Sequence, residues 1–144
     1  MRRPGLFLAT IALVLALGGA SLAGDDVFLL VVNPGTHITE LDADQLRNIY
    51  LKRVTELDGD VAAQPVDLPP GAPARERFTH DVIRKTPAQL RSYWNQQIFT
   101  GKGVPPVEAE SPASAIEFVL THPGAVAYVP AGIDLRGAKV IRLK

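Results

Sequence analysis

The sequence predicts an α/β domain in which helices and strands alternate along the chain and pack as layers. Residues 27–32, VFLLVV, form an uninterrupted apolar run that ends at an Asn-Pro-Gly turn. Such a run is typical of a strand covered on both faces, as in a parallel sheet. Residues 86–99 carry strong helix-start signals, and two further strands, 125–130 and 138–143, close the chain. Alternation of this kind indicates strands and helices in separate layers.

Two helices joined by a short strand are expected in the first half of the chain. Residues 41–53 form a helix capped by Asp42, with a glutamine three residues later completing a capping box. Residues 62–68 form a short strand, and residues 73–85 form a helix that begins with Pro73, a residue suited to the first helical position. The predicted buried stripes are Leu46, Ile49 and Tyr50 in the first helix and Ala74, Phe78 and Val82 in the second.

In the second half, Thr86 is the expected cap of a helix whose apolar stripe is Leu90, Trp94 and Ile98. Residues 100–110 contain two glycines and two adjacent prolines, so they are expected to form an irregular loop. A last helix occupies residues 111–124, with Ser and Pro at its start and Pro-Gly at its end.

The N-terminal segment has the pattern of an export signal. Arg2 and Arg3 precede an apolar run, and small residues lead up to Ala23. We expect a signal peptide at residues 1–23, cleaved after Ala23, and one domain at residues 24–144. An uncleaved membrane anchor is the alternative, because no charge interrupts residues 4–24.

Composition restricts the class of protein. Without Arg2 and Arg3, 13 basic side chains face 15 acidic ones, and no basic patch predicts nucleic-acid binding. The chain has no cysteine, so it carries no disulfide and no lipid-anchored cysteine at the cleavage point. These features indicate an exported, periplasmic protein stabilised by its core alone.

No set of residues predicts catalysis, a metal ion or a cofactor. His37, His80 and His122 are far apart and lack ligand spacing. A small hydrolase using Ser92 or Ser111 is a weak alternative, because neither lies on a sharp strand-to-helix turn. We therefore expect a protein that is not an enzyme.

Two stretches could bind an anion. GAPAR, residues 71–75, is a glycine turn before a helix, where free N–H groups and the helix dipole favour negative charge. FTGKG, residues 99–103, combines a hydroxyl, two glycines and a lysine, although a plain helix-ending loop also explains it. The candidate ligand-binding residues are Gly71, Ala72, Ala74, Arg75, Thr100 and Lys102.

Three motifs in order, VVNPGTHITELDADQLRNIYLKR, PVDLPPGAPARERF and PGAVAYV, resemble the second lobe of phosphate-type substrate-binding proteins of ABC transporters. The resemblance covers nearly all of residues 24–144. It implies a type II periplasmic-binding-protein-like fold: a single three-layer lobe with a central mixed, mostly parallel sheet flanked by helices. It also implies an association with phosphate transport.

The chain departs from this family in two respects. Most of the other lobe has no counterpart, although members of the family close two lobes on a ligand. The anion-binding turn also lacks its hydroxyl side chains: where the family has Gly-Ser-Gly-Thr, this chain has Gly71, Ala72, Pro73 and Ala74. Phosphate binders of this family place an arginine three residues before the glycine of the turn, and the corresponding residue in this chain is Leu68. Loss of these donors is expected to weaken a phosphate site by several orders of magnitude.

Two hypotheses follow from these patterns. The first is an exported, non-enzymatic module that binds a small oxyanion such as phosphate and works with a membrane transporter. The second is a ligand-free interaction module of the cell envelope, which binds another envelope protein or a second copy of itself through the face left open by the absent lobe.

Overall fold

A six-stranded mixed sheet forms the centre of the computed structural model, which describes residues 27–144. Five strands run in one direction, and β1 runs against both of its neighbours. This is the mixed, mostly parallel sheet that the resemblance implied. In spatial order the strands are β2 (Glu40–Leu41), β8 (Lys139–Leu143), β1 (Phe28–Val32), β7 (Ala125–Pro130), β5 (Gln64–Asp67) and β6 (Val107–Glu108).

The apolar run near the start of the chain is the strand β1, but the expectation that it lies in a parallel setting is wrong. Val31 and Val32 are fully buried, as a strand covered on both faces requires. However, β1 pairs antiparallel with β7 on one side and with β8 on the other. Helices cover both faces of the sheet at this point, and burial on both faces, rather than strand direction, determines an uninterrupted apolar pattern.

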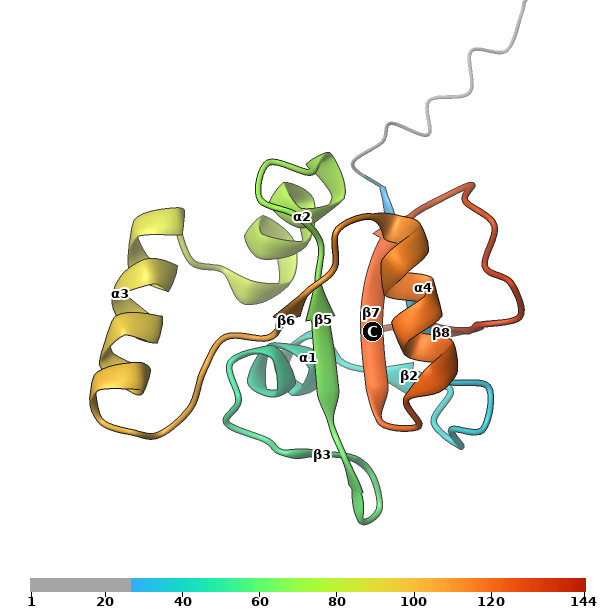
Figure 1. Cartoon of the computed structure of the whole chain (residues 1–144), viewed down its shortest axis with the longest axis horizontal. Helices are drawn as coiled ribbons and strands as arrows, with labels where there is room; N and C mark the ends of the chain where they lie inside the picture. The colour runs from blue at the N-terminus through green and yellow to red at the C-terminus, as the bar shows by residue number, and fades with distance from the viewer. Residues whose placement is uncertain (1–26) are drawn as a thin grey trace, which may run out of the picture.

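Helices lie on both faces of the sheet, so the fold has three layers. Figure 1 shows α4 in front of the sheet and α1 behind it. Side chains alternate along a strand, so Ala125, Ala127 and Val129 face α4, while Tyr128 faces α1 and α2. The small alanines let α4 approach β7 closely. The helices are α1 (Ala43–Tyr50), α2 (Pro73–Phe78), the π-helical turn η1 (Thr79–Ile83), α3 (Pro87–Phe99) and α4 (Pro112–Thr121).

An aromatic cluster fixes α2 against the sheet. Phe78 stacks on Tyr128 with ring centroids 3.9 Å apart, and the Tyr50 ring of α1 lies 4.7 Å from Phe78. Phe28 of β1 contacts Phe78 edge-on at 5.5 Å. Buried aromatic pairs of this kind are worth about 0.5–1.5 kcal/mol beyond their area burial. The cluster therefore determines where α2, and the glycine turn before it, lie over the end of the sheet.

The predicted helix starts are confirmed. Asp42 and Thr86 each form a complete capping box with the glutamine three residues later, and Ser111 accepts the N–H of Ser114. The predicted helix at residues 73–85 is α2 followed by η1, and the chain leaves it through Arg84 at φ 55°. The switch to a π-helical turn leaves the predicted face of Ala74, Phe78 and Val82 buried.

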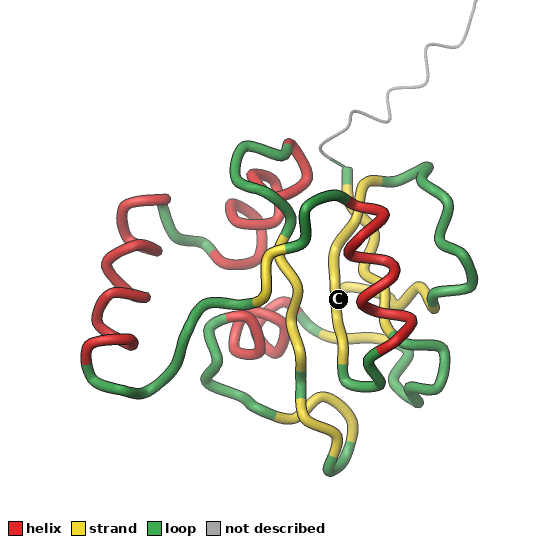
Figure 2. The backbone as a smooth tube through the Cα atoms, in the orientation of Figure 1, coloured by secondary structure: helices red, strands yellow, loops and turns green. Residues whose placement is uncertain are grey.

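The predicted apolar stripe of α3 is only partly confirmed. Trp94 is buried, but Ile98 is 53% exposed. Figure 2 shows α3 set apart from the strands, beyond the edge at β6. The far end of this helix therefore has no core to pack against.

The segment predicted as one strand, residues 62–68, divides into two parts. Its start belongs to a small hairpin of β3 (Glu56–Asp58) and β4 (Val61–Ala62), and the rest is β5. Pro65 lies in β5 without disrupting the sheet, because β6 pairs only with Val66 and Asp67. In residues 27–144 no helix has the length and apolar character needed to cross a membrane.

Candidate functional site

The glycine turn lies between the end of β5 and the start of α2. Gly71 has φ +83°, a left-handed conformation that favours glycine. The Ala72 N–H donates to the Pro69 carbonyl at 3.1 Å, so this amide is used inside the turn. Ala72 caps α2 without a side-chain hydrogen bond, and Pro73 has no N–H. The amides of Ala74 and Arg75 are the remaining donors of this first helical turn.

The Arg75 side chain turns inward and is held by three oxygen acceptors. One guanidinium nitrogen donates to the Leu68 carbonyl at 2.6 Å and to a Glu108 carboxylate oxygen at 2.8 Å. The other lies 3.8 Å from a carboxylate oxygen of Asp67. Only 21% of the Arg75 side chain is exposed. The guanidinium therefore ties the end of β5 to the edge strand β6.

Tyr128 completes this network from the neighbouring strand. Its hydroxyl donates to the Asp67 carboxylate at 2.6 Å and accepts the Leu68 N–H at 3.2 Å. Burial raises the pKa of Asp67, and the Tyr128 hydrogen bond and the Arg75 charge oppose this shift. Burial, followed by the charge of Asp67, also raises the pKa of Tyr128. We call Asp67, Leu68, Arg75, Glu108 and Tyr128 the arginine network.

The arginine network leaves little room for a ligand. With both carboxylates ionised, one cation faces two anions, so the local charge is −1. The adjacent cavity, lined in part by Asp67, Arg75, Trp94 and Pro106, has a volume of about 20 Å³. A water molecule needs about 10–15 Å³ by this kind of measure, so the cavity accommodates one water and not a tetrahedral oxyanion.

Thr100 and Lys102 lie at the opposite end of α3 from its junction with η1. Figure 1 places the loop after α3 at the lower left and the turn before α2 at the top. The Thr100 hydroxyl donates to the Gln96 carbonyl at 2.7 Å, which is an ordinary helix-end contact. The structure therefore brings Gly71, Ala72, Ala74 and Arg75 together, but it does not add Thr100 or Lys102 to that group.

The histidines lie apart, each with a local partner. His37 is 3.4 Å from Asp58, His80 is 2.8 Å from Asp81, and the His122 ring stacks on Phe118 at 3.8 Å. Within residues 27–144 there is no group of histidine and carboxylate side chains suited to a metal ion.

Sequence reasoning missed three residues of the arginine network: Asp67, Glu108 and Tyr128. Asp67 and Glu108 are register partners in the parallel pair β5–β6, and Tyr128 is on the next strand, β7. One signal was available, because Asp67 ends an apolar strand directly before a glycine turn. The pairing itself is a long-range contact that no local pattern predicts.

Comparison with known proteins identifies the fold. No family model matches the chain, and no curated protein matches its sequence. The solved structures that match include three with TM-scores of 0.62–0.64. One is described as a phosphate ABC transporter substrate-binding protein of Clostridium perfringens with bound phosphate, at 14% identity. The others are an ABC-type phosphate transport receptor from Vibrio cholerae, at 20%, and PstS from Borrelia burgdorferi, at 12%.

These matches show the fold of a phosphate-type substrate-binding protein over less than half of its length. They cover 81–83% of this chain but only 44–47% of the matched chains. The resemblance to a single lobe, and the α/β class with a mixed, mostly parallel sheet, are therefore confirmed.

Proposed function

We propose that the protein is an exported, non-enzymatic binding module built on the fold of a phosphate-type substrate-binding protein. The observation that carries this proposal is the match of more than four-fifths of the chain to proteins of that fold. Export to the periplasm rests on the N-terminal pattern of two arginines, an apolar run and a small-residue cleavage point.

The arginine network favours a protein partner over captured phosphate as the ligand. Arg75 is the first cation after the glycine turn in the sequence, and its guanidinium already binds two carboxylates and a carbonyl. Hydrogen bonds to charged groups contribute about 1.5–3 kcal/mol each, so an oxyanion would have to replace strong existing contacts. The oxyanion would also meet the carboxylates of Asp67, whose side chain is 16% exposed, and Glu108, whose side chain is 49% exposed. We infer that the face around Gly71 recognises an envelope protein, such as a transporter subunit, or a second copy of the chain.

Thermal unfolding with and without millimolar phosphate tests this choice. A ligand at a hundred times its dissociation constant adds about 2.7 kcal/mol to the free energy of unfolding, which raises the melting temperature by several degrees. We expect the exported protein to show the same small change with phosphate as with sulfate and chloride. A phosphate-specific rise of several degrees would contradict the proposal and support solute capture.

The partner face can be mapped by single-cysteine crosslinking, because the chain has no cysteine of its own. Pro73 is exposed beside the turn, whereas Val140 is exposed on β8 near the opposite edge of the sheet. We expect Pro73→Cys to form a specific crosslink in envelope preparations and Val140→Cys to form none. Equal crosslinking from both positions, or none from either, would count against recognition through this face.

Binding of a small oxyanion is the second candidate, favoured by the lack of a side-chain cap at the start of α2. In this case the amides of Ala74 and Arg75 would hold the anion. Glu108→Gln tests it, because this change removes one negative charge from the Arg75 guanidinium and keeps the side-chain shape. Gain of phosphate-specific stabilisation in Glu108→Gln would support an anion site that Glu108 masks. No gain would leave protein recognition as the supported function.

A further inference from the structure

Residues 84–107, which we call the arm, have an unbalanced charge. They comprise α3 with its flanking segments and contain Arg84, Lys85, Arg91 and Lys102, but no aspartate or glutamate. The whole chain has equal numbers of basic and acidic residues. Positive charge is therefore concentrated on the arm rather than spread evenly over the surface.

Two further cations from the body lie beside the arm. A Cβ placed on Gly103 would be 3.9 Å from the Lys52 Cβ, and the Arg53 guanidinium lies 5.6 Å from the centre of the Tyr93 ring. The Lys85 ammonium lies 5.7 Å from the same ring. The Tyr93 hydroxyl donates to the Leu51 carbonyl at 2.6 Å, which ties α3 to this part of the body. The arm thus carries four cations, and Lys52 and Arg53 of the body lie next to it.

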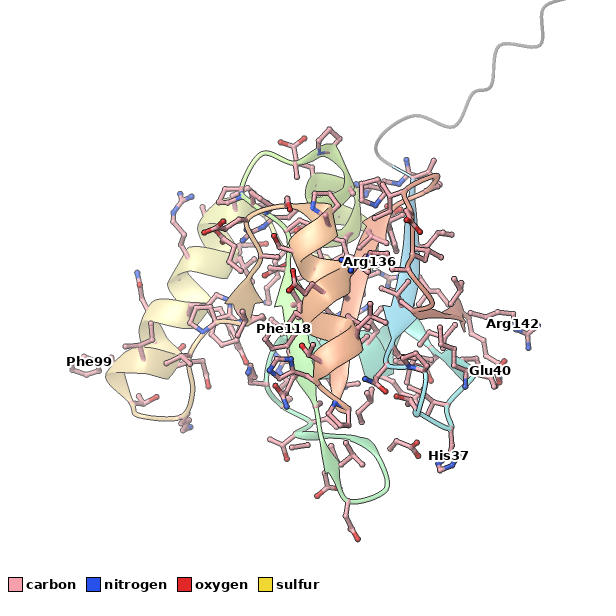
Figure 3. All side chains as sticks on the ribbon, turned by 45° about the vertical axis from the view of Figure 1, so that its right-hand side comes forward. His37, Glu40, Phe99, Phe118, Arg136 and Arg142 are labelled. Atoms are coloured by element: carbon pink, nitrogen blue, oxygen red, sulfur yellow. The ribbon has the colours of Figure 1, made fainter. Side chains whose placement is uncertain are left out.

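The end of the arm is also apolar. Phe99 is 92% exposed, and Figure 3 shows it pointing away from the body at the far end of α3. Val104 and Ile98 are 62% and 53% exposed. Three exposed apolar side chains within residues 98–104, next to cations, favour an interaction surface here.

The combination of charge and shape selects the partner. A twofold contact between two copies through the arm would place the cations of one arm against those of the other, which is repulsive. A protein partner would need a complementary hollow for a projecting tip. A lipid surface deforms around such a tip, and aromatic and aliphatic side chains flanked by Lys and Arg are typical of segments that lie at anionic membrane interfaces.

We propose that the arm binds the surface of a bilayer containing anionic phospholipids. Phe99, Ile98 and Val104 enter the boundary between headgroups and acyl chains, while Lys102, Arg91 and the cations around Tyr93 contact lipid phosphates. This surface is separate from the turn at Gly71, so the inference does not depend on the proposed function. It places the module on a membrane with the end of its sheet free to meet a partner.

Cosedimentation of the exported form, residues 24–144, with lipid vesicles tests the proposal. We expect binding to vesicles of equal parts phosphatidylcholine and phosphatidylglycerol, weak binding to pure phosphatidylcholine, and a decrease with added salt. Lys102→Ala is expected to lower the partition coefficient about fivefold, since one cation near such a surface contributes about 1 kcal/mol. Phe99→Ser is expected to lower it roughly tenfold, because one exposed apolar side chain no longer enters the lipid.

Matched controls come from the opposite side of the molecule. Arg136 is exposed in the loop between β7 and β8, and Val140 is 46% exposed on β8. Arg136→Ala and Val140→Ser should bind as the wild type does. The four substituted side chains are exposed, so circular dichroism should confirm an unchanged fold.

Three results would overturn the proposal. The first is equal binding to both kinds of vesicle, and the second is wild-type binding by both Lys102→Ala and Phe99→Ser. The third is capture of the chain by an immobilised polyglutamate matrix, lost in the arm variants, without any binding to anionic vesicles. That last result would assign the arm to an acidic protein partner instead.

Discussion

Asp67 is a carboxyl whose ionisation is perturbed by the fold. Burial raises its pKa, although Tyr128 donates to it and Arg75 lies nearby. A carboxyl whose folded pKa is raised binds a proton more readily in the native state than in the unfolded state. Its contribution to stability therefore falls as pH rises from the ordinary aspartate value of about 4 through the raised value.

The upward shift in the pKa of Asp67 leads to a prediction about how stability depends on pH. Asp67→Asn removes the titrating group and keeps an acceptor for the Tyr128 hydroxyl. The free energy of unfolding of the wild type, measured by urea titration, should fall relative to Asp67→Asn as pH increases from 4 toward 7. Glu40, whose pKa is lowered by its Lys144 partner, titrates identically in both proteins and cancels. A relative gain for the wild type would mean that Arg75 outweighs burial.

Tyr128→Phe should remove the contact that connects Asp67 to β7. The change deletes the 2.6 Å bond to Asp67 and leaves the Leu68 N–H without its hydroxyl acceptor. We expect a loss of about 2–3 kcal/mol in the free energy of unfolding. Tyr93→Phe is the matched control, because its hydroxyl donates only to the Leu51 carbonyl, and it should cost about 1 kcal/mol. Equal losses would show that the Asp67 bond has no special weight.

Gly124 is required by close packing rather than by a special backbone angle. A Cβ at this position would lie 1.8 Å from the Ala62 carbonyl oxygen, where β4 passes the start of β7. Gly124→Ala should destabilise the protein by about 1–3 kcal/mol, as overpacking of a fixed backbone does. Gly103→Ala meets nothing closer than 3.9 Å and should be close to neutral in the same denaturant measurement. Tolerance of Gly124→Ala would require β4 to move away freely.

At the scale of elements, the starts of the helices could be predicted from the sequence, but the elements that pack against each helix could not. Asp42, Thr86 and Ser111 cap their helices as expected, because a cap depends on residues within four positions of it. The exposure of Ile98 was not predicted, because an apolar stripe does not say whether a neighbouring element is present. The direction of β1 was also missed, since burial on both faces looks alike in parallel and antiparallel strands.

Because α3 is weakly attached to the core, its N-terminal cap should stabilise this helix rather than the whole fold. Thr86→Ala should remove the capping bond to the Gln89 N–H and cost about 1 kcal/mol. The cost should appear mainly as faster amide hydrogen exchange within residues 87–99. Ser111→Ala, at the start of the well-packed helix α4, should instead lower global stability by a similar amount. A loss of global stability in Thr86→Ala without faster exchange along α3 would contradict this division.

At the scale of the whole molecule, the buried core and the arm should respond differently to denaturant. The core runs through α1, α2, α4 and the sheet, whereas Trp94 is the one buried side chain of α3. Trp94 is also the only tryptophan in the chain, so its fluorescence reports on the arm. We expect its urea midpoint to lie below that of far-ultraviolet circular dichroism, because regions with few buried contacts open first. Coincident midpoints would show that the arm unfolds with the core.

The sequence by itself determined the α/β class, the helix starts, the position of the glycine turn and the loss of hydroxyl groups from it. Each of these depends on residues close together in the chain, where capping, turn chemistry and apolar period act. Only the tertiary structure decided that Arg75 points inward to Asp67 and Glu108, that Tyr128 joins them, and that Thr100 and Lys102 lie elsewhere. Arg75 and Glu108 are 33 residues apart in the sequence, and Asp67 and Tyr128 are 61 residues apart. Strand pairing creates them, and strand pairing is a property of the folded chain as a whole.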